Sequence, residues 1–151
     1  MNTVLQTLVP LARRLIGLLE TLQAPALLAA RLYLARVFFL SGLTKLRDWD
    51  ITLALFQDEY HVPLLPPELA AYMGTTSELL LPVLLVLGLG GRFAALGLFV
   101  LNAVAAISLP EISDAALQQH QFWGSLLLGL LLWGPGGWSA DRWIARRWAG
   151  R

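Results

Sequence analysis

Four long apolar stretches divide this chain and decide most of what it can fold into. They run over about residues 26–46, 69–89, 93–109 and 121–138. Each approaches the roughly 20 residues that an α-helix needs to cross about 30 Å of hydrocarbon. Charged residues are only 14% of the chain, whereas soluble domains carry about 25%, so few remain to cover a surface facing water. The sequence therefore predicts an all-α protein, a bundle of four transmembrane helices.

Glycine and proline mark the ends of these stretches. Gly88, Gly90 and Gly91 predict a tight turn between the second and third spans, and Pro110 ends the third. The run Gly134–Gly137 interrupts the fourth span near its end.

The segment before the first span has the pattern of an amphipathic helix. Its apolar residues recur at helical spacing: Val4, Leu5, Leu8, Leu11, Leu15, Leu18, Leu19 and Leu22. Two interpretations stay open, a helix lying at the membrane surface or a cytoplasmic extension of the first span packed on the bundle. Pro25 predicts a break between the segments. We therefore divide the chain into an interfacial helix, 1–24, and a four-span domain, 25–151, that ends in a short basic tail. Because Arg13 and Arg14 interrupt the apolar pattern, we expect no cleaved signal peptide.

The loop charges predict the orientation. Residues 45–68 carry two positive and five negative charges, and the loop after the third span carries only Glu111 and Asp114. Eight of the eleven positive residues fall on the opposite side: Arg13, Arg14, Arg31, Arg92, Arg142, Arg146, Arg147 and Arg151. Positive charge favours the cytoplasmic side, so both termini are expected there.

Polar residues within the spans are the first candidate site. Charged groups in a span cost about 2.5–3.5 kcal/mol each on insertion scales, and so they are functional candidates by default. Arg36, Glu78 and Asn102 each fall roughly 15 Å deep at about 1.5 Å per residue. We expect them to form a midplane cluster, with Arg36 facing Glu78. Such a cluster either locks the bundle or lines a ligand or proton site.

A second group lies near the outer face. Lys45 ends the first span and His120 precedes the fourth, so the two are expected to meet beneath the acidic loop and receive an anionic or quinone-like headgroup. The alternative for Lys45 is a side chain that only extends to the interface. His61 and His120 are the only histidines and both are expected outside, which disfavours a haem. We expect no metal site, because ligands must converge and the sequence does not show convergence.

Several classes are excluded by composition. The chain has no cysteine, which removes iron–sulfur clusters and thiol chemistry. Its net charge is +1 and it has no basic run, so nucleic acid is not an expected partner. No nucleophile or phosphate-binding motif is present.

Four segments together resemble the DoxX family. They are Arg31-Leu-Tyr-Leu-Ala-Arg-Val-Phe-Phe-Leu-Ser-Gly-Leu-Thr-Lys45, Tyr60-His-Val-Pro-Leu-Leu-Pro66, the run from Glu78 to Arg92, and Gly134-Pro-Gly-Gly-Trp-Ser-Ala-Asp141. The resemblance covers about residues 27–147. It implies a four-span protein of the bacterial inner membrane, associated in some members with redox systems. The positions that it carries over are Arg36, Lys45, Glu78 and the Gly-Pro-Gly ending with Asp141.

Three functions compete at this stage. The first is a quinone-linked redox subunit that works with a partner protein and has no electron carrier of its own. The second is an anchor or assembly factor without chemistry, for example in the biosynthesis of modified metal-binding peptides. The third is a small transporter, and because four spans are few for a monomeric pathway, a homo-oligomer is expected. The lipid bilayer is a partner in all three.

Overall fold

Helices make up nearly all of the molecule. The computed structural model describes the backbone of residues 2–150 and the side chains of residues 8–150. Over this range the chain has no strand, which confirms the all-α class. The helices are α1 (Asn2–Arg47), α2 (Trp49–Asp58), α3 (Pro67–Leu87), α4 (Gly91–Ser108), α5 (Asp114–Trp133) and α6 (Ala140–Ala149). The side chains of Val4, Leu5 and Arg151 lie outside the described residues.

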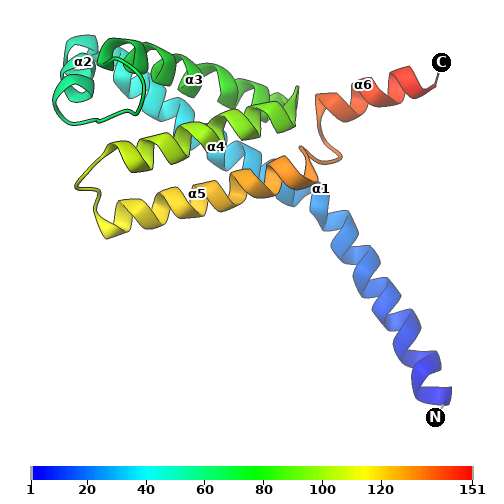
Figure 1. The fold of residues 1–151 in the computed structure, drawn as a ribbon. Helices are drawn as coiled ribbons and strands as arrows, with labels where there is room; N and C mark the ends of the chain where they lie inside the picture. Colours follow the sequence, from blue (N-terminus) through cyan, green and yellow to red (C-terminus); the bar gives the residue numbers. More distant parts are fainter. Residues whose placement is uncertain (1, 151) are drawn as a thin grey trace.

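The helices α1, α3, α4 and α5 pack side by side (Figure 1), and we call this packed group the bundle. Each packs against its neighbour in the chain, α1 on α3, α3 on α4 and α4 on α5, and α5 also touches α1. Fully buried leucines fill the centre, one from each helix: Leu34, Leu85, Leu98 and Leu127. Burying a leucine stabilises the fold by about 1.5–3 kcal/mol relative to exposure in water, but in lipid this gain falls and close packing carries more of the stability.

Three helices are long and apolar enough to cross a membrane: Leu8–Arg47 within α1, then α3 and α4. The helix α5 has 20 residues, but its first turns carry Gln118, Gln119 and His120, which lower its hydropathy. Its crossing therefore stays a prediction. The helix also begins at Asp114 and ends at Trp133, several residues earlier at each end than the sequence pattern indicated.

The first helix does not break at Pro25, so that prediction is wrong. Helix α1 runs through both Pro10 and Pro25 over 46 residues, a length of about 69 Å at about 1.5 Å per residue. Proline removes one helical hydrogen bond but does not have to end a helix. The half before Pro25 projects away from the bundle (Figure 1), and its leucines are about half exposed, Leu11, Leu15 and Leu19 among them.

Two further helices were not foreseen. The acidic loop contains α2, whose first turn is capped by the Asp48 side chain accepting from the Ile51 N–H. The basic tail forms α6, whose Trp143 and Trp148 are exposed and whose Arg147 stacks over the Trp143 ring. These helices lie at opposite ends of the bundle (Figure 1). We call the end carrying α2 and residues 59–66 the cap end, and the end carrying residues 88–91 and 134–139 the turn end.

Candidate functional site

An ion pair between Lys45 and Glu78 lies inside the bundle toward the cap end. The Lys45 Nζ donates to both carboxylate oxygens of Glu78, at 2.8 and 2.7 Å. It also donates to Ser41 Oγ at 2.9 Å, and Ser41 in turn donates to Glu78 Oε1 at 3.2 Å. Glu78 is only 8% exposed. A carboxylate this deep needs a charged partner and hydrogen bonds, and the two residues of α1 supply both.

A glycine brings the two helices together at this point. A Cβ added to Gly42 would lie 3.0 Å from the Glu78 Cβ and 3.0 Å from the Leu79 side chain. The helices α1 and α3 therefore approach most easily where α1 has no side chain. Ser41 and Lys45 flank Gly42 on the same part of the helix, so the close approach is what places them within reach of Glu78.

The expected pair of Arg36 with Glu78 is wrong, because Lys45 is the partner. At about 100° per residue, the step from Arg36 to Lys45 leaves the two on opposite faces of α1, and only one face meets α3 at Glu78. Helical side chains also lean toward the N-terminus, which carries the Lys45 ammonium from the helix end down to the carboxylate. The depth of the residues in the membrane suggested Arg36 as the partner of Glu78, whereas the direction in which each side chain leaves α1 makes Lys45 the partner.

The cap end closes over this pair. Thr52 of α2 is buried and donates to Lys45 O and Asp48 O, which holds α2 against the end of α1. The ring of Tyr60 packs on Phe56 at 5.0 Å between centroids, and the His61 N–H donates to Ser108 O at the end of α4. Burial raises the pKa of the Tyr60 hydroxyl, and the charges of Glu59 and Glu78 raise it further. Tyr60 therefore stays a neutral donor within the field of Glu78.

One buried hydroxyl near the pair lacks a partner. Thr75 precedes Glu78 by nearly one turn of α3 and is 3% exposed, and its Oγ1 has no hydrogen bond in the described part of the chain. Buried polar groups are nearly always bonded, and an exception calls for a water or a ligand. Sequence reasoning missed Thr75 and Ser41, because a hydroxyl in an apolar span carries no distinctive pattern.

Asn102 and His120 form a separate polar pair. The Asn102 Nδ2 donates to His120 O at 2.9 Å, and His120 Nδ1 lies 2.8 Å from Asn102 Oδ1. Because Oδ1 only accepts, His120 donates from Nδ1 here. The His120 ring stacks edge-on against Trp123, whose indole N–H donates to the Tyr33 hydroxyl. Both residues were candidates from the sequence, but neither is bonded to Lys45 or Glu78. The five candidate residues therefore separate into three groups: the Lys45–Glu78 ion pair, the Asn102–His120 pair and Arg36 alone.

At the turn end, Arg31 is the residue whose role the sequence did not reveal. It is 1% exposed and donates to four backbone carbonyl oxygens: Leu85 at 2.9 Å, Val86 at 2.5 Å, Pro135 at 2.6 Å and Trp138 at 2.9 Å. It thereby ties α1 to the end of α3 and to the loop before α6. Counting it only as a cytoplasmic charge overlooked the free carbonyls that every helix end presents.

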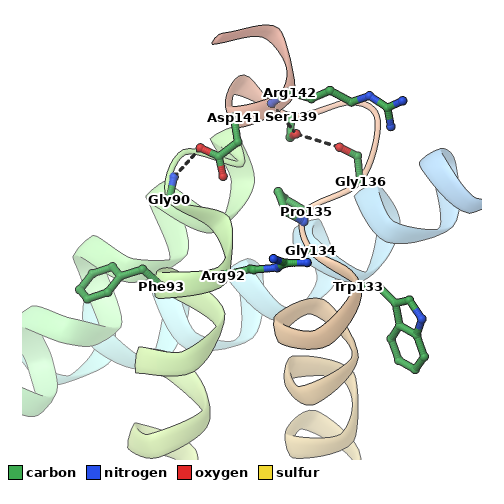
Figure 2. A pocket seen from close by; sticks show the side chains of 10 residues that line it. All are labelled: Gly90, Arg92, Phe93, Trp133, Gly134, Pro135, Gly136, Ser139, Asp141 and Arg142. Carbon is green, nitrogen blue, oxygen red and sulfur yellow. Dashed lines mark hydrogen bonds between the residues drawn. The ribbon is translucent and has the colours of Figure 1, made fainter. Parts of the chain in front are cut away.

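Asp141 completes this end by capping α4. Its two carboxylate oxygens accept from the N–H groups of Gly90 and Gly91, each at 2.8 Å, and Figure 2 shows it above the start of that helix. Gly88 and Gly90 have φ values of 64° and 55°, as the predicted tight turn requires. A pocket of about 410 Å³ lies beside Asp141, lined in part by Arg92 and Arg142. Both oxygens of this carboxylate are therefore already bonded to the start of α4.

Among the described residues, no three histidine or acidic side chains come together in a way that could hold a metal. His61 lies in the cap loop with its ring near Glu59 O, apart from the His120–Asn102 pair.

Comparison with known proteins decides the family. The model of the DoxX family matches residues 26–110, which is more than half of the chain. The chain belongs to the DoxX family. This confirms the resemblance seen in the sequence, and with the apolar helices it makes the chain a multi-pass membrane protein.

The matched region of the DoxX family contains Arg31, Lys45, Glu78 and Asn102, whereas Asp141 lies beyond it. The chain is also 39% identical over 88 residues to an uncharacterised protein of Haemophilus influenzae. That match covers 56% of this chain and 56% of the relative, so the chain spans about half of the relative's length. No solved structure matches.

Proposed function

We propose that this chain is a four-span protein of the inner membrane, with both termini cytoplasmic, that binds a lipid-soluble quinone beside the Lys45–Glu78 pair. A partner protein supplies the electrons, since the chain has no cysteine and no cluster motif to carry them. The observation that carries the proposal is the buried pair with the unbonded Thr75 hydroxyl on the same helix. Interfaces between helices are favoured places for ligand sites.

The residues present fit the chemistry of a quinone headgroup. Its carbonyl oxygens need hydrogen-bond donors, and Thr75 and Tyr60 provide two hydroxyls. The Lys45 ammonium is bonded to Glu78 and Ser41 and holds the carboxylate in place beside them. When bound, the quinone would accept two electrons from the partner protein and two protons, which would come from water and pass through Glu78. The Glu78 carboxylate is the proton acceptor of the site. Ser41 is hydrogen-bonded to Glu78 and to Lys45, and these contacts give a short path along which a proton can move.

The distribution of charge supports this orientation. The cap end carries acidic residues, with Asp48, Asp50 and Glu59 among them, and the turn end carries Arg31, Arg92 and Arg142. By the bias of arginine and lysine toward the cytoplasm, the site opens toward the periplasmic half of the bilayer. Cysteine accessibility labelling at Gln57 and Ala145 tests this orientation, since only Gln57 should react from outside.

Quinone bound to the purified protein tests the function. Wild-type protein extracted in mild detergent should carry quinone that organic extraction and ultraviolet absorbance detect. Glu78→Gln and Lys45→Met should lose most of it at equal expression, whereas Arg146→Gln on the exposed face of α6 should keep it. Equal quinone in all four preparations would refute the site.

One observation favours a second function. The projecting half of α1 leaves leucines exposed over Leu8–Leu22, which suits an anchor that assembles a partner protein or lies on the membrane. Deleting residues 2–22 distinguishes the two functions. If the segment is an anchor, the shortened protein should no longer co-purify with its partner, whereas quinone binding at Lys45–Glu78 should persist.

A further inference from the structure

Arg36 lies in an apolar groove on the outer surface of the bundle. The groove has a volume of about 350 Å³ and runs between α1 and α3. Besides Arg36, its walls include Leu32 and Phe39 from α1 and Val83 and Leu87 from α3. Leu32, Val83 and Leu87 are about half exposed, so the groove faces the lipid and not the core.

The charge of Arg36 is not balanced within the described chain. It forms no ion pair there, the one such pair being Lys45–Glu78. The other acidic groups are unavailable. Asp141 is engaged by Gly90 and Gly91, Glu20 is about 24 Å away along α1 at about 1.5 Å per residue, and the rest lie toward the cap end. No carboxylate of the described chain competes for this guanidinium, so an anion from outside the chain can pair with it.

The depth of Arg36 suits a lipid phosphate. Arg31 donates to Leu85 O and Val86 O, so that level of α1 lies beside the end of α3. Arg36 is about 7.5 Å further into the membrane at about 1.5 Å per residue. Its side chain leans back toward the N-terminus and reaches the Leu87 end of the groove, where the apolar span ends. A long arginine of this kind places its charge at headgroup level and its stem in hydrocarbon.

We infer that this groove binds one anionic phospholipid of the leaflet at the turn end. The phosphate accepts hydrogen bonds from Arg36, whose planar fork matches phosphate oxygens, and an acyl chain lies along Leu32, Val83 and Phe39. A second copy of the chain fits less well, because it brings no free carboxylate to this level. The site is separate from the Lys45–Glu78 pair, since Arg36 and Lys45 occupy opposite faces of α1.

Lipid binding to the purified, delipidated full chain tests this inference. Phosphatidylglycerol and phosphatidylcholine are added separately, and bound lipid is counted by native mass spectrometry together with the shift in melting temperature. Wild type should bind one phosphatidylglycerol in preference to phosphatidylcholine. Arg36→Gln should weaken that binding about tenfold or more, because a hydrogen bond to a charged group is lost. Arg146→Gln, which removes the same charge from the exposed face of α6, should bind as wild type does.

A second variant tests the groove without changing charge. Val83→Trp should fill the acyl-chain path and also abolish the preferred adduct, while Arg36→Lys should retain part of the affinity. Both Arg36 variants should fold, because the side chain is exposed and makes no contact that the bundle requires. Equal phosphatidylglycerol binding by wild type and Arg36→Gln would overturn the inference. So would equal binding of the two lipids, or a dimer that appears in wild type and disappears in Arg36→Gln.

Discussion

The two ends of this bundle solve the burial of charge in different ways. At the turn end, Arg31 donates to four backbone carbonyl oxygens and Asp141 accepts from two backbone N–H groups. At the cap end, Lys45 and Glu78 bond to each other and to Ser41, and the Thr75 hydroxyl nearby is left without a partner.

The difference teaches which end is built for stability. A charged side chain that is bonded to the backbone cannot bind a ligand without breaking these hydrogen bonds and loosening the helix ends. A side-chain ion pair can change its protonation or its partner while the backbone stays in place. We therefore expect substitutions at the turn end to act on stability, and substitutions at the cap end to act on ligand binding as well.

The largest loss of stability is expected for Arg31→Leu. It leaves four carbonyls without their charged donor, and we expect a loss of about 4 kcal/mol in the free energy of unfolding. Tryptophan fluorescence during SDS titration measures it. Arg36→Leu on the same helix is the matched control and should cost less than about 1 kcal/mol, because that side chain is exposed. If Arg31→Leu is as stable as the wild type, the four hydrogen bonds of Arg31 do not stabilise the turn end.

Breaking the ion pair on one side comes next. Lys45→Met should cost about 3 kcal/mol, because it leaves the Glu78 carboxylate buried and unpaired. The double variant Lys45→Met/Glu78→Leu should recover most of that loss, and the same titration measures both. If the double variant is no more stable than the single one, the two residues are not energetically coupled.

Removing the cap of α4 should have a moderate effect. Asp141→Ala frees the N–H groups of Gly90 and Gly91 and should cost about 1.5 kcal/mol, typical of a lost helix cap. Asp114→Ala is the control, since Asp114 stands in the first turn of α5, where the Ser113 hydroxyl makes the cap. It should change the unfolding free energy by less than about 0.5 kcal/mol. If Asp141→Ala also lowers the unfolding free energy by less than about 0.5 kcal/mol, the cap that Asp141 provides does not stabilise the start of α4.

The smallest effect on stability is expected for Thr75→Val. The substitution keeps the shape and removes a buried hydroxyl that has no partner, so stability should stay equal or rise by up to about 1 kcal/mol. Quinone affinity should nevertheless fall severalfold, measured as the ligand-induced shift in melting temperature. A marked loss of stability would mean that the hydroxyl is bonded within the fold, and it would remove the reason for assigning a ligand there.

Much of the fold could be predicted from the sequence. Hydropathy located the bundle helices, and Gly88 and Gly90 located the turn, because these depend on local composition. The continuation of α1 through Pro25 could not be read, since a proline kinks or ends a helix according to its surroundings. The helix α2 was missed because its ten residues are too short for a clear period.

The sequence named the residues of the two polar pairs but not their pairings. Lys45, Glu78, Asn102 and His120 were all named, since polar groups in apolar spans are conspicuous. Their partners depend on direction around each helix and on the close approach at Gly42, which a one-dimensional depth estimate does not contain. The role of Arg31 depends on carbonyls of distant segments, which no local pattern reveals.

The response of the double variant Lys45→Met/Glu78→Leu to quinone tests the central claim most directly. We predict that it folds, unfolds near the wild-type SDS concentration and shows no shift in melting temperature when a soluble quinone analogue is added. A folded double variant that the analogue stabilises as strongly as it does the wild type would contradict the account and leave the pair a purely structural contact.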